Sequence, residues 1–290
     1  MTIIYFVLIF GLVVVAHEFG HFLLAKANGI HVIEFAVGMG PKLLHFKKGE
    51  TENCLRLLPI GGACIFENED ELGGGENRVY EEGSFPAASV WARISTVIAG
   101  PLFNFILGFL LALIIVWFSG SDRPVINGLI EGYPAQEAGI EPGDVITHMN
   151  GERIYLAREI YINMYINKGK DMELVYERDG KSYETTVTPK YSEEEGRYLI
   201  GFQGYGEYVD CKNANIFPYT YYEVRYCLTS TIKSLGMLIS GNGSKDDVSG
   251  PIGVAQVIGD ISEQAAPYGM GVVLINLLNI TLLLSVNLGV

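Results

Sequence analysis

The first 25 residues constrain this chain most, because an uncharged apolar run leads directly into three ionisable side chains. Residues 1–16 read MTIIYFVLIFGLVVVA, and His17, Glu18 and His21 follow within the segment HEFGH before the apolar run resumes. A helix rises about 1.5 Å per residue, so such a segment is long enough to cross a hydrocarbon core of roughly 30 Å. Ionisable groups are costly at that depth, and their presence indicates a functional site.

The spacing of these side chains is typical of a metal site. Positions i and i+4 of a helix share one face, so His17 and His21 can reach the same metal ion. Glu18 lies beside them, where a carboxylate can accept a proton from water. In a soluble helix the same motif could be a solvated polar face, but the apolar surroundings argue against that alternative. The segment predicts hydrolytic metal chemistry inside or next to a bilayer.

Two further apolar runs predict a multi-pass α-helical membrane protein. Residues 94–118 form the second run, and residues 271–290 form the start of a third. The N-terminus lacks the basic region and the small-residue cleavage site of a cleavable signal, so residues 1–25 are expected to remain as a transmembrane helix. With 290 residues, 49% of them hydrophobic and 18% charged, the chain has room for a soluble insert between its spans.

Charge and cysteine usage narrow the class of protein. The formal net charge is −13, which argues against nucleic acid as a partner because phosphate binding needs a basic surface. The four cysteines are scattered without CxxC spacing, so we expect free thiols rather than a structural zinc site or a disulfide. They are Cys54, Cys64, Cys211 and Cys227.

Residues 26–93 are expected to form a cytosolic loop. Its first half alternates apolar and polar residues around Lys48-Gly49-Glu50-Thr51, which predicts a membrane-associated β-hairpin loop. Its second half is acidic and rich in glycine, and a mobile linker is expected there. Lys26 and Arg93 flank the loop next to the two spans, which favours the cytosolic side. An edge strand near the motif could pair with an extended substrate.

Residues 121–190 are expected to form an inserted α+β domain. Strand patterns enclose a short helix and a longer one over 156–166, and Asp179-Gly180 marks a tight hairpin. Residues 191–270 are expected to be an extracytoplasmic linker with a further strand near its start and an amphipathic helix over 219–239.

The ordered motifs of the chain resemble those of the site-2 protease family of intramembrane zinc metalloproteases. The similarity is to the bacterial regulator-of-sigma-E-protease branch, which carries a PDZ domain. Seven segments carry it across the whole chain: AHEFGHF at 16–22, VGMGP at 37–41, LPIGG at 58–62, AGPLFNF at 99–105, PAQEAGIEPGD at 134–144, VSGPIG at 248–253 and SVNLG at 285–289.

This resemblance implies the roles of particular residues. His17 and His21 would be two ligands of Zn2+, and Glu18 would be the general base. The β-structured loop, which includes Gly61 and Gly62, would contact substrate. The PDZ-like domain would screen bulky substrates, and peptide termini are its possible ligands.

Asn104 lies in a span that the family places close to the zinc site. The resemblance implies that its amide could hold an unwound substrate backbone. Hydrogen bonding between neighbouring helices is an equally weighted alternative for an asparagine in a bilayer.

The family's third zinc ligand is an aspartate in an LDG motif, located shortly after the segment that resembles SVNLG. The chain ends at Val290 before such a motif, so we expect a C-terminally incomplete protein. A membrane-anchored PDZ peptide-binding module that is catalytically incomplete is therefore the alternative function. An ion or metal transporter is disfavoured because no second span carries ionisable residues.

The resemblance also implies partners and location. We expect a protein of the bacterial cytoplasmic membrane, in contact with the lipid bilayer and with its PDZ-like domain on the extracytoplasmic side. The expected substrates are single-pass membrane proteins already shortened outside the membrane, such as an anti-sigma factor or a remnant signal peptide.

Overall fold

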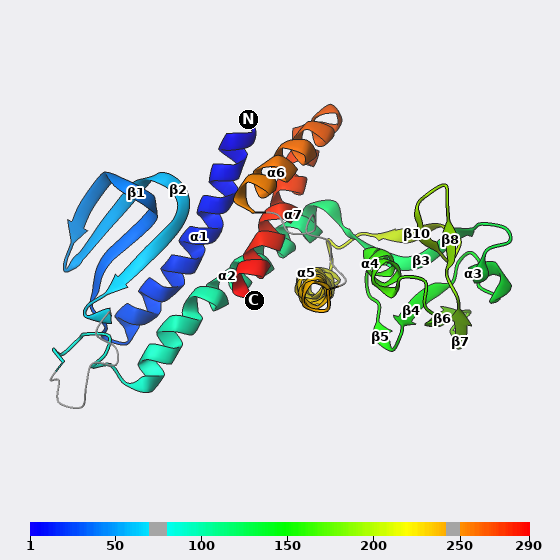
Figure 1. Ribbon diagram of the computed structural model, residues 1–290, viewed down its shortest axis with the longest axis horizontal. Helices are drawn as coiled ribbons and strands as arrows, with labels where there is room; N and C mark the ends of the chain where they lie inside the picture. Colours follow the sequence, from blue (N-terminus) through cyan, green and yellow to red (C-terminus); the bar gives the residue numbers. More distant parts are fainter. Residues whose placement is uncertain (70–79, 242–249) are drawn as a thin grey trace. The chain divides into compact units, whose positions relative to one another are not determined.

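The computed structural model describes residues 1–69, 80–241 and 250–290, which fall into two compact units (Figure 1). The first unit combines Met1–Ala112 with Lys245–Val290, and the second comprises Leu113–Ser244. Most of the acidic linker expected before the second span lies at 70–79, outside the described residues.

Among the described residues, three helices are long and apolar enough to cross a membrane: α1 (Thr2–Ala27), α2 (Val90–Ser119) and α7 (Met270–Gly289). Their apolar surfaces remain largely exposed, as expected for helices that face lipid rather than a protein core. Pro101 lies inside α2, where it removes one backbone donor from the helix. α2 begins in the first unit and ends in the second.

In the first unit, the N-terminal half of α1 packs against α7 and a shorter helix, α6 (Pro251–Ala265). Ile9, Ile258 and Leu277 meet in this core, with Ile258 fully buried. A 3-10 turn, η3 (Ala266–Tyr268), connects α6 to α7. We expected only a linker here. The glycine-proline pair at the start of α6 favours a helix N-terminus and could have predicted this helix.

The hairpin expected after α1 folds back on itself. Strands β1 (Val32–Lys48) and β2 (Thr51–Phe66) are antiparallel, and Val37 pairs with both Leu55 and Gly62. Two long strands therefore supply four stretches of sheet. Their order is 62–66, 32–37, 51–58 and 42–48. The bends need glycine, since Gly38, Gly40 and Gly61 all have positive φ.

The second unit contains a sheet in the order β10-β3-β4-β6-β7, with β5 paired to β4 and a separate β8–β9 hairpin. β10 pairs with β3 along its length, so the domain extends to residue 209, beyond the boundary expected at 190. The strands are β3 (Ser121–Leu129), β4 (Val145–Met149), β5 (Glu152–Arg153), β6 (Met172–Arg178), β7 (Lys181–Val187), β8 (Lys190–Ser192), β9 (Arg197–Leu199) and β10 (Phe202–Val209).

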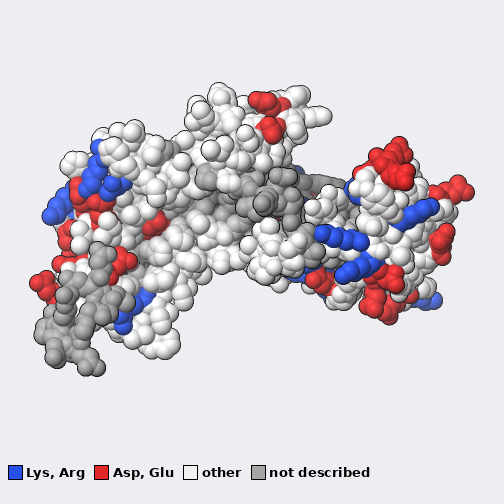
Figure 2. Space-filling view, in the orientation of Figure 1, with Lys and Arg blue, Asp and Glu red and all other residues white. Residues whose placement is uncertain are grey.

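Three helices accompany this sheet: α3 (Pro134–Glu137), α4 (Ala157–Asn167) and α5 (Ile216–Ile239). The core between the sheet and the first two is apolar and includes the fully buried Ile146, Ile160 and Leu174. At its edge the buried Asp144 carboxylate accepts two hydrogen bonds of 2.7 Å from Arg178. Charged side chains cover much of this domain, whereas the surface of the membrane helices is nearly free of them (Figure 2).

Candidate metal centre and active site

The polar cluster of α1 lies where that helix crosses α2. Two glycines allow the close approach. A Cβ atom added at Gly20 would collide with the backbone carbonyl of Ala99, and one added at Gly100 would collide with the imidazole of His21. Small residues at helix contacts in membranes have this effect in general. The crossing therefore brings the α2 backbone directly against the motif.

The His21 ring is oriented by the backbone of α2. Its Nδ1 lies 2.8 Å from the carbonyl oxygen of Thr96. A carbonyl only accepts hydrogen bonds, so Nδ1 carries the proton and Nε2 keeps its lone pair. This is the tautomer that a metal-binding imidazole needs, with the other ring nitrogen held by an outer partner.

The His17 ring is also held by a group of α2, the side-chain amide of Asn104. Its Nδ1 lies 3.0 Å from the side-chain amide of Asn104, which is fully buried. Within the part of the chain that the structure describes, the amide oxygen of Asn104 has no hydrogen-bond partner. The oxygen and nitrogen of an asparagine amide can exchange places by a half-turn. After that half-turn the orphaned oxygen accepts a hydrogen bond from Nδ1–H, which frees Nε2 for a metal.

The two free ring nitrogens converge on one small volume beside Gly100. A Cβ atom at Gly100 would lie 2.8 Å from Nε2 of His17 and closer still to Nε2 of His21. The ring centroids are 4.8 Å apart and the ring planes are nearly perpendicular, at 80°. Zinc takes imidazole nitrogens at about 2.0–2.1 Å, and both Nε2 atoms lie within 2.8 Å of the Cβ position at Gly100. The donor set and the space fit a zinc ion.

Glu18 lies against the sheet rather than against α2. A Cβ atom at Gly62 would be 2.6 Å from Cγ of Glu18 and 3.0 Å from the Val14 side chain. The backbone N–H of Cys64, two residues further along β2, lies near the Glu18 carboxylate. Burial raises the pKa of the Cys64 thiol to about 12, so that thiol stays neutral beside the carboxylate. The carboxylate is thus held between its own helix and the β2 strand.

The stretch 62–66 of β2 is an edge of its sheet. It pairs with 32–37 on one side, and no strand among the described residues pairs with its other side. Gly61 precedes it in a left-handed conformation, with φ +79°, and packs on Met39. An edge of this kind offers unpaired backbone groups to an extended chain, and here it adjoins the Glu18 carboxylate.

The opposite face of the sheet carries a compact charge cluster around Glu34. Burial acts to raise the pKa of Glu34, but hydrogen bonds from Lys42, Arg56 and Cys54 outweigh it and lower the pKa to about 2. The distance from Lys42 Nζ to the Glu34 carboxylate is 2.8 Å, and the same ammonium lies 2.8 Å from Glu52. These residues hold three stretches of the sheet together, 32–37, 51–58 and 42–48.

α7 contributes to the site through Asn104. The Ser285 hydroxyl donates a 2.8 Å hydrogen bond to the backbone carbonyl of Asn104, and both residues are fully buried. One turn of α2 further on, Gly108 lies against Val286 of α7. Helix α2, whose Asn104 contacts His17, is therefore itself fixed by α7.

The structure brings together all six residues that the motifs singled out. His17, His21 and Asn104 meet on the α2 side of α1, while Glu18 meets Gly62 on the sheet side. Gly61 is next to Gly62 in the chain and packs on Met39. Among the described residues no group of three His, Cys, Asp or Glu side chains surrounds one point, so the two imidazoles have no third protein ligand there.

Sequence reasoning missed four contributors to this site. The Thr96 carbonyl is a backbone group, which no side-chain pattern reveals. Gly100 and Gly20 lay within recognised motifs, but only the helix crossing explains why a side chain is excluded there. Ser285 also lay within a motif, and its spacing from Asn104 gave no sign of contact.

Comparison with known proteins identifies the class. Residues 5–290 match the family model described as Peptidase family M50. A relative from Clostridium acetobutylicum is 35% identical, over 100% of this chain and 81% of its own length. Zinc metalloprotease RasP of Bacillus licheniformis is 30% identical, and Regulator of sigma-W protease RasP of Bacillus subtilis is 29% identical. Each alignment covers 100% of this chain and 85% of the relative.

A solved structure matches part of the chain. It is the crystal structure of the PDZ domain of an SdrC-like protein from Listeria monocytogenes. It is 18% identical with a TM-score of 0.26, over 28% of this chain and 85% of that chain.

The chain therefore belongs to peptidase family M50, as its motifs predicted. It is a zinc metalloprotease. The family assignment confirms the expected enzyme class and the expected metal.

Proposed function

We propose that this protein hydrolyses peptide bonds within the transmembrane segments of other membrane proteins. The single observation that carries the proposal is the position of the site. Two imidazoles lie at a helix crossing and the neighbouring Glu18 carboxylate lies against the sheet, all three on an apolar helix of membrane-spanning length that a soluble substrate would not enter. The relatives' names support a protease, and one of them is named Regulator of sigma-W protease.

In this proposal each side chain has a distinct task. His17 and His21 hold zinc through Nε2, while Asn104 and the Thr96 carbonyl fix the two ring orientations. Bound zinc supplies Lewis acidity, which polarises a peptide carbonyl and acidifies water. Glu18 accepts the proton of the attacking water and delivers it to the leaving amine nitrogen. A third protein ligand is required by the usual coordination of catalytic zinc.

The substrate must be unwound before it can react, because the carbonyls of an intact transmembrane helix are hydrogen-bonded within the helix. We propose that the unwound segment pairs with the 62–66 edge of β2, adjacent to Glu18. Gly61 and Gly62 let that chain approach, since neither carries a side chain that would cover the edge. Asn104 then acts on His17, rather than on substrate, as its 3.0 Å contact suggests.

The expected substrates are single-pass membrane proteins, such as an anti-sigma factor or a remnant signal peptide. We place the protein in the bacterial cytoplasmic membrane as a multi-pass protein. Lys26 and Arg93 flank the loop that carries the sheet, which supports a cytosolic position for it and an extracytoplasmic position for the inserted domain. We also propose that this domain is PDZ-like and binds peptide termini, as its PAQEAGIEPGD segment suggests.

The test is cleavage of a model transmembrane substrate by the chain in proteoliposomes. Glu18→Gln removes the proton acceptor but keeps the shape of the side chain, so cleavage should fall by at least about 100-fold. Zinc content and membrane insertion should not change. The matched control is Glu263→Gln, which alters an exposed carboxylate of α6. Cleavage that survives Glu18→Gln, or that Glu263→Gln also abolishes, would overturn the proposal.

A further inference from the structure

Helix α5 of the second unit turns its charged side chains toward the inserted domain. Glu223 is only 2% exposed, and Arg158 of α4 donates two hydrogen bonds to its carboxylate, at 2.9 and 3.0 Å. The most exposed positions of the helix are large and apolar, with Ile239 at 88% and Phe217 at 64%. An ordinary surface helix has the opposite polarity. The boundary between α5 and the domain is therefore rich in charged groups.

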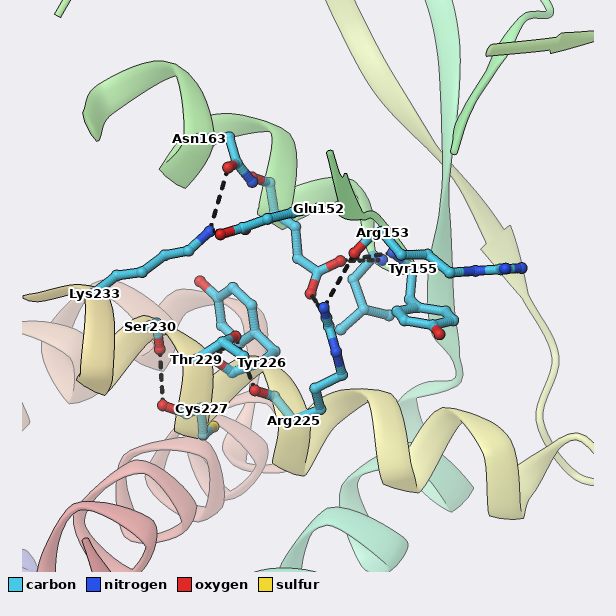
Figure 3. Close-up of polar contacts among 12 residues, drawn as sticks. Glu152, Arg153, Tyr155, Asn163, Arg225, Tyr226, Cys227, Thr229, Ser230 and Lys233 are labelled. Atoms are coloured by element: carbon cyan, nitrogen blue, oxygen red, sulfur yellow. Dashed lines mark hydrogen bonds and ion pairs between the residues drawn. The ribbon is translucent and has the colours of Figure 1, made fainter. Parts of the chain in front are cut away.

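Ion pairs close one part of this boundary. Arg225 of α5 pairs with Glu159 of α4. Two turns further along α5, Lys233 pairs with Glu152 and lies 3.2 Å from the side-chain amide oxygen of Asn163, as Figure 3 shows. In this part of the boundary each cation has an acid beside it, so no charge is left for a ligand.

Beyond Lys233 the boundary opens into a cavity of about 530 Å3. Its volume falls within the range of ligand sites, which is about 300–1,000 Å3. The cavity lies between the end of α4 and the last turns of α5. Polar side chains form part of its wall, whereas Ile166 of α4 and Met237 of α5 supply apolar surface. The wall is therefore suited to a ligand that has both polar and apolar groups.

The cavity is positively charged although the protein as a whole is acidic. Lys168 and Lys170 follow the end of α4 and are exposed, and Lys233 is half-buried beside Glu152. Among the described residues that line the cavity, Glu152 is the one acid, so three ammonium groups face one carboxylate. The chain has a formal net charge of −13. A local excess of amines in such a chain favours an anionic ligand.

The helix ends at the cavity indicate which kind of anion fits. α4 ends at Asn167 and α5 ends at Ile239, so both helices bring their C-terminal ends to this space. The last carbonyls of a helix lack intrahelical donors and carry partial negative charge. Compact anions such as phosphate are bound instead at helix N-termini. A peptide suits both features, because its backbone N–H groups can donate to the carbonyls while its side-chain carboxylates reach the lysines.

We propose that the cavity between α4 and α5 binds an acidic stretch of an extended polypeptide from another protein. Carboxylates of the ligand lie on Lys168 and Lys170, and an apolar side chain of the ligand packs on Ile166 and Met237. The ligand is an internal stretch of sequence, so this site is distinct from the peptide-terminus binding proposed for the domain. It is also independent of the zinc site.

The experiment is fluorescence anisotropy with the full chain in nanodiscs of zwitterionic lipid. The probe is a short peptide of alternating glutamate and leucine, labelled with fluorescein at its N-terminus and amidated at its C-terminus. Lys168→Glu combined with Lys170→Glu should weaken binding at least about tenfold, since like charges that face each other across an interface are strongly unfavourable. The matched control combines Lys181→Glu with Lys212→Glu, an equal charge change at exposed lysines outside the cavity. Its affinity should stay within about twofold, because salt screens distant charges.

A second measurement locates the bound peptide. Benzoylphenylalanine in place of Met237 should form a photo-crosslink to the peptide, and benzoylphenylalanine in place of the exposed Tyr183 of β7 should not. A crosslink at Tyr183 alone would overturn the proposal.

Three results of the binding assay would also overturn it. Equal weakening by the two lysine pairs would mean general attraction to the protein. Undiminished binding of a peptide with glutamine at every glutamate would mean that charge is not recognised. Displacement by inorganic phosphate, but not by chloride of equal ionic strength, would mean that the site takes a compact anion.

Discussion

Helices α1 and α5 both direct apolar side chains outward and polar side chains inward, yet they differ in how those polar groups are satisfied. In α5 the inward charges of Glu223 and Arg225 pair with opposite charges on α4. In α1 each imidazole is held at Nδ1 only, and both Nε2 atoms face the same small space. In α5 the inward polar groups attach the helix to α4, whereas in α1 they form the candidate zinc site.

The difference teaches which polar groups signal function. A buried charge that is fully paired makes a specific contact, and it is weak evidence for anything more. A buried polar group held on one side, with a lone pair left over, is prepared for a ligand. The following changes test that distinction, from the largest expected effect to the smallest.

Gly100→Ala should abolish the metal site while leaving its helix intact. The added methyl group would occupy the space between the two Nε2 atoms, so we expect zinc affinity to fall by at least about 100-fold, beyond the usual loss from an outer-shell change. Alanine favours a helix over glycine by about 1 kcal/mol, so helix content should not fall. Competition against a chelating dye measures affinity. Gly11→Ala in α1 is the control, because nothing lies within 4 Å of its Cβ position. Normal zinc affinity in Gly100→Ala would refute the assigned geometry.

Arg158→Ala should destabilise the second unit by about 3 kcal/mol, because it leaves a buried carboxylate without its partner. Burial raises the pKa of Glu223 above its usual 4.5, and the attraction of Arg158 opposes that rise. Without Arg158 the pKa rises further.

The sign of the pH dependence follows from that shift. A carboxyl group with a raised folded-state pKa binds more protons in the folded than in the unfolded state, so its stabilising effect is lost as pH increases. The defect of Arg158→Ala should therefore be small near pH 4.5 and grow toward neutral pH. Thermal unfolding of the purified chain at several pH values measures it. Arg123→Ala, at an exposed pair with Glu207, should cost less than about 1 kcal/mol at every pH. A pH-independent loss would contradict the role given to Glu223.

Substitution of Asn104 is expected to change zinc affinity least. It tests which atom of the side-chain amide faces His17. If the amide oxygen accepts from Nδ1–H, Asn104→Asp keeps the acceptor and should retain zinc affinity. Asn104→Leu loses it, and a decrease of about 10–100-fold is expected for a lost outer-shell partner. Zinc titration of both variants decides the matter. If Asp and Leu weaken binding equally, the amide does not orient His17 and a direct role toward substrate becomes the better assignment.

Much of the first helix could be predicted from sequence because its information is local. The apolar run, the HEFGH spacing and the absence of charge all lie within 25 consecutive residues. The same holds for α5, whose expected start at Tyr219 differs by three residues from Ile216. Periodicity predicts such helices without knowledge of what they touch.

The partners of these helices could not be predicted, since they depend on contacts distant in sequence. Thr96 orients His21 across 75 residues, and Ser285 supports Asn104 across 181. The doubled strands β1 and β2 depend on bends at glycines whose positive φ appears only in three dimensions. The reversed polarity of α5 was also hidden, because an amphipathic pattern does not say which of its faces is buried.

The 75-residue separation between His21 and Thr96 has a consequence for how the enzyme is made. A ribosome adds about 5–20 residues per second, so about 4–15 seconds pass between synthesis of the first histidine pair and of the carbonyl that orients it. During that interval α1 can enter the membrane, but its histidines have neither a fixed tautomer nor the Gly100 space beside them. The histidine pair of α1 therefore acquires its complete surroundings only after α2 has been synthesised.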